Sequence, residues 1–170
     1  MDSRTAYKKS LTATVYIINN GKVLLHKHKK YNTWFPVGGH IEANELPHEA
    51  AVREASEESG LNIKLLLTDS KDFYLGLVER VPTPFAVYHE GIGSQEEFLD
   101  FIYIGFSEES TVKGKEAENS HFRWFSYEEL SDKNEDIKIH IRNTAISCLS
   151  YVNKLDNCPS QAEYFTEGIL

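Results

Sequence analysis

Residues 38–61 read GGHIEANELPHEAAVREASEESGL, and this stretch decides how the rest of the chain is arranged. Pro47 suits the first turn of a helix, where its missing N–H group costs no hydrogen bond. Gly60 suits the left-handed position that follows a last helical turn. The sequence therefore predicts a Gly-Gly turn, a short acidic loop and a helix that ends at Gly60.

Three glutamates lie on one face of this predicted helix. Glu54, Glu57 and Glu58 have i, i+3 and i+4 spacing, and like charges so placed destabilise a helix by roughly 0.2–0.5 kcal/mol per pair. Arg53 relieves part of this repulsion, because it lies four residues from both Glu49 and Glu57. A Mg²⁺ ion would relieve more, since it prefers carboxylate oxygens and bridges to substrate phosphates. Three glutamates alone are also compatible with a solvated acidic face.

The wider spacing distinguishes between these two interpretations. The fixed positions are Gly39, Glu45, Arg53, Glu54, Glu57, Glu58, Gly60 and the aliphatic Leu61. This pattern resembles the Nudix box, here residues 39–61, and the chain is similar to the Nudix (MutT-like) hydrolases. That family usually has a larger aliphatic residue at the position of Ala55. Alanine still faces inward, so we expect closer packing of the helix on the sheet.

Composition limits the remaining possibilities. A chain of 170 residues with 41% hydrophobic residues predicts a single domain, residues 1–170. A net charge of −8 argues against generic binding to nucleic acid. No apolar run is long enough for a membrane span and no secretory leader is evident, so we expect a cytoplasmic protein. Cys148 and Cys158 are expected to stay reduced, and no zinc motif is present.

The elements on either side of the box predict an α+β fold. The β-branched residues 11–19 predict a strand, and Asn20-Gly21 predicts a hairpin to residues 22–28. Further strands are expected at residues 61–67, 73–81, 85–89, 98–106 and 121–125. Helices are expected after the capping box at Ser126, over residues 136–155, and briefly at residues 160–163. This order suits a mixed sheet between helices, and the resemblance implies the same Nudix-type α/β/α sandwich.

Three further features are left with open interpretations. The cluster His26–Lys30 either holds substrate phosphates or forms a protected, charged strand end, which is the more ordinary role. Trp34 is expected in the core or in a lid rather than stacked on a base. Asp100 lies inside an apolar strand, so it must find a partner or face a wet site.

The resemblance implies hydrolysis of a diphosphate linkage in a nucleoside diphosphate derivative, with Mg²⁺ or Mn²⁺ as cofactor. The expected metal ligands are Glu57 and Glu58, with Glu54 as a further ligand or as the residue that orients water. The Gly38 carbonyl is a plausible additional ligand. Arg53 belongs to the same catalytic set, where it would tether a glutamate rather than touch phosphate.

Other functions also fit the sequence. The substrate is expected to be a small nucleoside diphosphate derivative, and a homodimer is a possible assembly. A housekeeping dNTP pyrophosphatase that removes oxidised nucleotides is the alternative enzyme. A catalytically idle Nudix-fold nucleotide-binding module would be expected to have lost part of its glutamate set, which is intact here.

A fourth carboxylate is expected from outside the box. Nudix proteins commonly supply a glutamate from the loop ahead of a strand that contains tryptophan. Here that strand contains Trp124, and the loop offers Glu116 and Glu118. Glu118 fits the family spacing better and is the predicted catalytic and metal-binding residue. Two solvated loop glutamates are the alternative.

Overall fold

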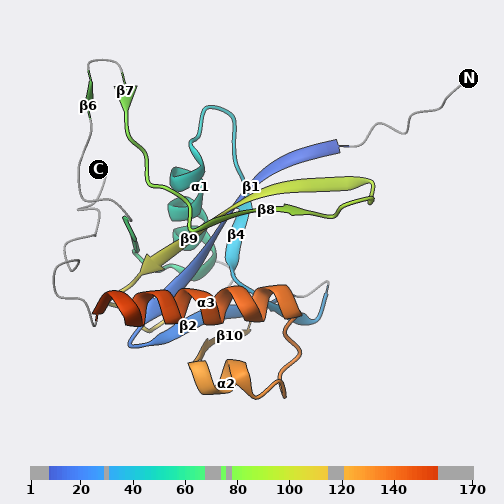
Figure 1. Ribbon diagram of the computed structural model, residues 1–170, viewed down its shortest axis with the longest axis vertical. Coiled ribbons are helices and arrows are strands. Elements are labelled where there is room, and N and C mark those ends of the chain that lie inside the picture. Colours follow the sequence, from blue (N-terminus) through green and yellow to red (C-terminus); the bar gives the residue numbers. More distant parts are fainter. Residues whose placement is uncertain (1–7, 29–30, 68–73, 76–77, 115–120, 157–170) are drawn as a thin grey trace, which may run out of the picture.

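The computed structural model describes residues 8–28, 31–67, 74–75, 78–114 and 121–156. An eight-stranded mixed sheet lies between helices α1 and α3, which cover opposite faces (Figure 1). The helices are α1 (Pro47–Glu54), α2 (Tyr127–Ser131) and α3 (Ile139–Asp156). The strands of the sheet are β1 (Lys8–Asn19), β2 (Lys22–His28), β3 (Thr33–Phe35), β4 (Val37–His40), β5 (Lys64–Leu65), β8 (Ala86–Glu90), β9 (Glu96–Phe106) and β10 (His121–Phe125). The predicted α+β sandwich is confirmed.

Strand β1 is the centre of this sheet. The strand order is β10-β2-β1-β9-β5, with β3 attached to β2, β4 to β1 and β8 to β9. β1 runs parallel to β9 and antiparallel to both β2 and β4. Because side chains alternate along a strand, Val15 and Ile17 pack under α1 while Tyr16 and Ile18 pack under α3. The two halves of the core therefore meet through β1.

The hairpin signal and most of the strand predictions are confirmed. Asn20 and Gly21 have φ angles of +47° and +70°, as a tight hairpin turn requires. β2 and β10 have the predicted bounds, β8 and β9 agree within two residues, and Ser126 caps α2 as expected. β1 begins three residues before the predicted strand, and α3 begins three residues after the predicted helix start. The turn expected at residues 160–163 lies outside the described residues.

The predicted Gly-Gly turn is wrong, because Gly38 and Gly39 lie inside strand β4. Gly38 pairs with Thr14 and Gly39 pairs with Ala13 on β1. A Cβ atom on Gly38 would lie 2.6 Å from the carbonyl oxygen of Ala13. The two glycines therefore mark a close approach to neighbouring groups rather than a change of chain direction.

The box helix also differs from a uniform α-helix. It begins at Pro47 and ends before Gly60, whose φ is +71°, as predicted. Between these ends, the α-helix stops at Glu54 and continues as a π-helical turn, Ala55–Ser59. The Ser59 carbonyl accepts hydrogen bonds of 2.9 Å from the N–H groups of Lys113 and Gly114. These bonds tie the widened last turn to a distant loop, a constraint that local spacing does not reveal.

Two other predicted strands are shorter than expected. Residues 61–67 form a strand only at β5, while Leu61 and Ile63 pack into the core beneath α1. Residues 73–81 contain two short strands, β6 (Tyr74–Leu75) and β7 (Val78–Glu79), which pair as a separate antiparallel sheet. Residues 61–67 therefore mainly pack beneath the box helix, whereas β6 and β7 form a short antiparallel pair of their own.

The expected core placements of Trp34 and Cys148 are confirmed. Trp34 is 7% exposed, and its ring meets Phe125 edge-on with centroids 5.0 Å apart. Cys148 is fully buried on α3, and burial raises the pKa of its thiol. Cys158 lies outside the described residues. In the described part of the chain, no helix combines the length and apolar character needed to cross a bilayer.

Candidate functional site

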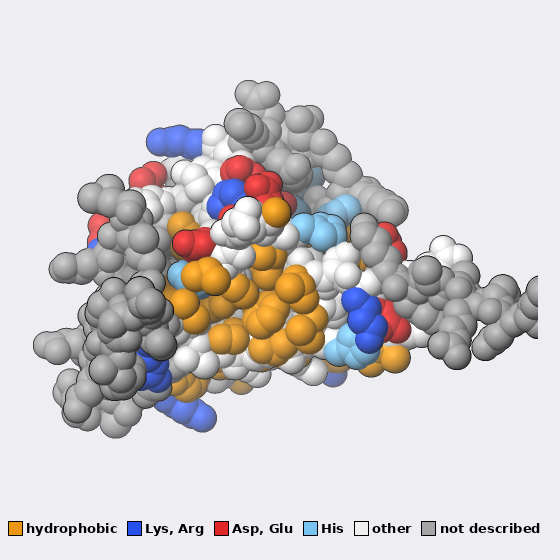
Figure 2. Space-filling model, turned by 90° about the horizontal axis from the view of Figure 1, so that it is seen from above, with side chains coloured by type: hydrophobic (Ala, Val, Ile, Leu, Met, Phe, Trp, Pro, Cys, Tyr) orange, Lys and Arg blue, Asp and Glu red, His pale blue; other side chains and the backbone are white. Residues whose placement is uncertain are grey.

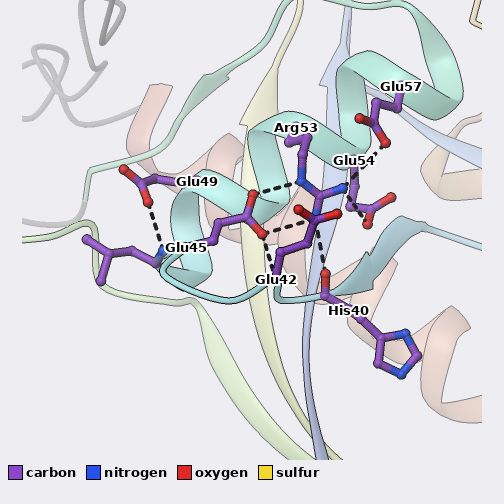
Figure 3. A network of polar contacts seen from close by, with 8 residues as sticks. His40, Glu42, Glu45, Glu49, Arg53, Glu54 and Glu57 are labelled. Carbon is purple, nitrogen blue, oxygen red and sulfur yellow. Dashed lines mark hydrogen bonds and ion pairs between the residues drawn. The ribbon is translucent and has the colours of Figure 1, made fainter.

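Arg53 connects the acidic loop to the glutamates of the box helix (Figure 3). Its Nε and Nη2 atoms donate to the two carboxylate oxygens of Glu45, at 2.7 and 3.0 Å. Nη1 donates to Glu54 Oε1 at 2.8 Å and lies 3.4 Å from Glu57 Oε2. Nη2 also donates to the His40 carbonyl at 3.0 Å. One guanidinium group therefore fixes three carboxylates relative to the end of β4.

The charges in this network stabilise one another. Hydrogen bonds from Arg53 hold the pKa of Glu45 below its ordinary value, and the same bonds raise the pKa of Arg53. Glu45 also accepts from the N–H of Glu42 at 3.0 Å, and this bond holds the acidic loop ahead of α1. Glu49 does something else: its carboxylate accepts from the Leu46 N–H at 2.8 Å and caps the start of α1.

Each of the two β4 glycines meets a glutamate of the box. A Cβ atom on Gly39 would lie 2.3 Å from Glu54 Oε1, so the carboxylate fills the space that a side chain would need. The N–H of Gly38 donates to Glu58 Oε2 at 3.3 Å. The glycines therefore admit two carboxylates against β4, with Glu58 at the outer edge of the strand and Glu54 over its face at Gly39.

The Gly38 carbonyl is directed toward the same edge. Residue 38 pairs with Thr14, and its N–H points at Glu58 instead of at β1. In an antiparallel pair, the N–H and C=O groups of one residue point to the same side. The carbonyl oxygen of Gly38 is therefore available next to Glu58, as the sequence suggested.

The three glutamates of the predicted site differ in how closely they approach β4. Glu54 and Glu58 lie against β4, whereas Glu57 is more exposed, with 55% of its side chain accessible against 14% for Glu54. Within the described residues, no three His, Cys, Asp or Glu side chains converge closely enough, as they stand, to hold an ion. Two carboxylates and an outward carbonyl are nonetheless the oxygen donors that Mg²⁺ prefers, and the glycines leave room for them. Glu116 and Glu118 lie outside the described residues.

A cavity of about 170 Å³ adjoins this group on the α3 side of the sheet. Its walls include Gly38, Glu58, Glu90, Asp100, His26 and His28. Glu58 comes from the opposite side of the sheet and reaches the cavity past the edge of β4. On the face drawn in Figure 2, acidic side chains gather around a basic one, with histidine side chains and an apolar surface nearby.

The sequence predicted that Asp100, inside an apolar strand, must find a partner or face a wet site. In the structure it has hydrogen-bond partners and also lines the cavity. Its Oδ1 accepts from the Thr12 hydroxyl at 2.9 Å, and its Oδ2 lies 2.9 Å from the Thr14 hydroxyl. Burial raises the pKa of Asp100 to about 6, against the lowering effect of these hydrogen bonds. Glu90 and His140, which also line the cavity, carried no signal in the sequence, because one closes a strand and the other lies near a helix start.

The histidines of the basic cluster face the same cavity. His26 and His28 share one side of β2, as alternation predicts, and both line the cavity wall. His28 also packs on Phe35, with ring centroids 5.4 Å apart. Lys29 and Lys30 lie outside the described residues. A larger hollow of about 810 Å³ lies around Asn19, Phe106 and Leu149, and its walls include none of the predicted site residues.

Comparison with known proteins agrees with this geometry. The NUDIX domain family matches residues 8–144 of the chain. Among curated proteins, the chain is 32% identical over 94 residues to an m7GpppN-mRNA hydrolase, NUDT17, from Xenopus laevis. That match covers 52% of this chain and 30% of the Xenopus protein, so the chain spans less than a third of that relative's length.

Solved structures show the same architecture over most of the chain. A hydrolase of the NUDIX family from Clostridium perfringens is 29% identical with a TM-score of 0.72, covering 84% of this chain and 97% of that one. The MutT protein from Methanosarcina mazei Go1 is 18% identical with a TM-score of 0.60, covering 88% of this chain and 98% of that one. The second likeness is one of fold.

Proposed function

The chain belongs to the NUDIX hydrolase family, and from that premise we propose that it cleaves a diphosphate linkage in a nucleoside diphosphate derivative by attack of water. The observation that carries the proposal is the contact of Glu54 and Glu58 with consecutive glycines of β4, beside a cavity. An idle binding module would not need carboxylates crowded against a strand edge, where their mutual repulsion is costly. The intact glutamate set therefore favours an enzyme over a binding module.

We propose that Glu58 and the Gly38 carbonyl form the centre of a Mg²⁺ or Mn²⁺ site, with Glu54 and Glu57 as the remaining carboxylates. When bound, such an ion neutralises charge on the diphosphate and helps to generate a nucleophile from water. The Glu54 carboxylate is already held against β4 by its position next to Gly39 and by its hydrogen bond from Arg53. To join the site, the Glu57 carboxylate would have to give up its long contact of 3.4 Å with Arg53 Nη1.

Arg53 acts on the glutamates and not on the substrate in this proposal. The Nε and Nη2 atoms of Arg53 donate to the two carboxylate oxygens of Glu45. Nη1 donates to Glu54, and Nη2 also donates to the His40 carbonyl. It therefore positions Glu54 while the net negative charge of the site stays low. Glu118 remains our proposal for a carboxylate supplied from outside the box, as a ligand or as a base that takes a proton from water.

The family and the cavity both support the proposed substrate class. In this proposal, the reacting diphosphate of the substrate lies at the carboxylates, and one of its end groups lies in the cavity of about 170 Å³ beside them. The Xenopus relative is named for a capped mRNA, which contains such a polyphosphate link. The housekeeping dNTP pyrophosphatase remains the alternative, because a dNTP offers the same linkage.

A substrate panel in Mg²⁺ separates these functions. We would incubate the protein with ADP-ribose, a UDP-sugar, a dinucleoside polyphosphate, a capped dinucleotide and the four dNTPs, and identify the products by ion-exchange chromatography. Hydrolysis in H₂¹⁸O would show which phosphorus takes up oxygen from water. Release of a nucleoside monophosphate from a derivative supports the proposal, and release of pyrophosphate from dNTPs alone supports the alternative. Equal turnover by Glu58→Gln protein would mean that the activity arises elsewhere.

A further inference from the structure

Asp100 is held in one orientation by two threonines of the neighbouring strand. Thr12 lies directly opposite Asp100 in the parallel pairing of β1 with β9. The Thr12 hydroxyl donates to Oδ1 at 2.9 Å, and the Thr14 hydroxyl lies 3.1 Å from Oδ1 and 2.9 Å from Oδ2. The residue as a whole is only 6% exposed. The carboxylate is therefore fixed to the sheet, and it is not free to swing toward solvent.

The threonines leave part of this carboxylate unused. A hydroxyl group has one proton, so two threonines donate at most two hydrogen bonds at a time, while an ionised carboxylate offers about four acceptor positions. Glu90, which has the same sign, acts on Asp100 electrostatically. Among the described residues Asp100 forms no ion pair. Its remaining acceptor positions can be satisfied by a ligand in the cavity that it lines.

The position of Asp100 relative to the carboxylates of the box suits a substrate contact. Gly38 on β4 pairs with Thr14, and Asp100 on β9 contacts the same threonine from the other side of β1. Gly38 and Asp100 lie two strand spacings apart across the sheet, roughly 10 Å, and they are also offset by two residues along the strands, roughly 7 Å, because Asp100 pairs with Thr12. A cavity of about 170 Å³ holds the equivalent of five or six waters at roughly 30 Å³ each. The cavity therefore suits one base or one sugar rather than a whole nucleotide.

We propose that Asp100 determines substrate specificity by accepting two adjacent N–H or O–H donors from the group attached to the diphosphate. Two parts of a nucleotide have this chemistry: the N1–H and N2–H edge of guanine, and the 2′- and 3′-hydroxyls of ribose. Both match the two oxygens of one carboxylate. The inference rests on the proposed function, because it places the substrate in this cavity.

A purely structural role explains the residue less well. Asparagine would bind the same two threonine hydroxyls without placing a charge inside the sheet. Ionisation of a buried carboxyl is costly, and here the cost is incurred at a cavity wall beside the reacting centre. A donor-rich ligand offsets that cost, because hydrogen bonds to a charged group are stronger than neutral ones.

Calorimetric binding of reaction products tests the inference without requiring turnover. The probes are GMP, IMP (which lacks the 2-amino group) and dGMP (which lacks the 2′-hydroxyl), each in Mg²⁺. We expect the wild-type protein to bind GMP about tenfold more tightly than one of the two analogues, the scale of a bidentate contact to a base edge. Weaker IMP assigns the donors to guanine, and weaker dGMP assigns them to ribose.

Asp100→Asn should bring that preference to about onefold. Glu97→Gln is the matched control, because Glu97 lies on the same strand with its side chain toward the other face, bonded to His89 at 2.9 Å. If Asn impairs folding, Asp100→Ser serves as the second variant. No discrimination by the wild type, or an equal preference in the Asp100 variants, would overturn the inference. Selective binding without hydrolysis would instead contradict the proposed function alone.

Discussion

Glu54 occupies the space in which residue 39 would carry a side chain: a Cβ atom on Gly39 would lie 2.3 Å from Glu54 Oε1. The neighbouring Gly38 is restricted in a different way. Its Cβ atom would lie 2.6 Å from the Ala13 carbonyl oxygen and 2.8 Å from the Thr14 Cα atom, and both of these belong to the backbone of β1. The absence of a side chain at Gly39 thus leaves room for the Glu54 carboxylate, and its absence at Gly38 allows β4 to pair closely with β1.

Alanine substitutions at these glycines should therefore have different effects. Gly39→Ala should lower turnover by about two orders of magnitude, the loss expected when a preorganised charged group is displaced, with little change in melting temperature because a carboxylate can swing away. Gly38→Ala should destabilise the fold by about 1–3 kcal/mol, as overpacking does. Urea denaturation and steady-state kinetics measure both effects. A fully active Gly39→Ala protein would contradict the proposed position of Glu54.

Glu58→Gln should leave the fold intact and lower turnover at saturating Mg²⁺ by at least about a hundredfold. Glutamine keeps the shape of the side chain but loses the charge that a divalent cation needs. Glu49→Gln is the matched control on the same helix, since its amide oxygen can still accept from Leu46. Activity that persists in EDTA, or equal losses in the two variants, would exclude a metal site at Glu58.

Arg53→Lys should reduce turnover at least tenfold although the positive charge remains. An ammonium group cannot reproduce the planar fork that binds both oxygens of Glu45 while another donor reaches Glu54. Comparison of Arg53→Lys with Arg53→Met in kinetic assays separates charge from geometry. If lysine restores full activity, a positive charge alone is sufficient.

The same arginine predicts a dependence of stability on acid pH. The pKa of Glu45 is lowered in the folded protein, so its contribution is present above its unfolded pKa and is lost as pH falls through the folded value. Unfolding free energies measured between pH 7 and pH 3 should fall less steeply in Arg53→Met than in the wild type. Parallel curves would show that Glu45 gains nothing from Arg53.

Asp100 predicts a change of the opposite sign at higher pH. Its pKa is about 6 in the folded protein against 3.8 for the free group, so the folded state binds more protons in this window and loses stability as pH rises through it. At 1.36 kcal/mol per pKa unit, ionisation costs about 3 kcal/mol. Asp100→Asn should therefore gain stability relative to wild type between pH 4.5 and pH 7.5, measured by urea denaturation. A difference that does not vary with pH would mean that the carboxyl ionises freely.

Glu118 and Glu116 offer a paired test of the carboxylate from outside the box. Under saturating Mg²⁺, Glu118→Gln should lower turnover far more than Glu116→Gln, because only Glu118 has the spacing from Trp124 that the family uses. Single-turnover kinetics would separate the chemical step from product release. Equal and small effects would indicate two solvated glutamates.

Local signals predicted the ends of the box helix, which begins at Pro47 and ends before Gly60. The fixed spacing also placed Glu54 and Glu58 on that helix, and both lie against β4. The strand character of Gly38 and Gly39 was not predictable, because two consecutive glycines usually indicate a turn and only pairing with β1 makes them extended. Sequence alone did not place Asp100 and Gly38 in the wall of one cavity either: they share it only because β1 pairs with a different strand on each side.

The outer edge of β4 also affects how copies of this protein meet one another. An edge strand offers unpaired backbone groups to any neighbouring strand, and charged side chains are a common protection against such pairing. Here the Gly38 N–H is already bonded to Glu58, and Glu54 lies beside Gly39. A strand from a second molecule would have to displace the Glu58 carboxylate to extend the sheet. The Glu58 carboxylate that we propose as a metal ligand would thus also hinder intermolecular strand addition, and its neutralisation would favour aggregation along this edge.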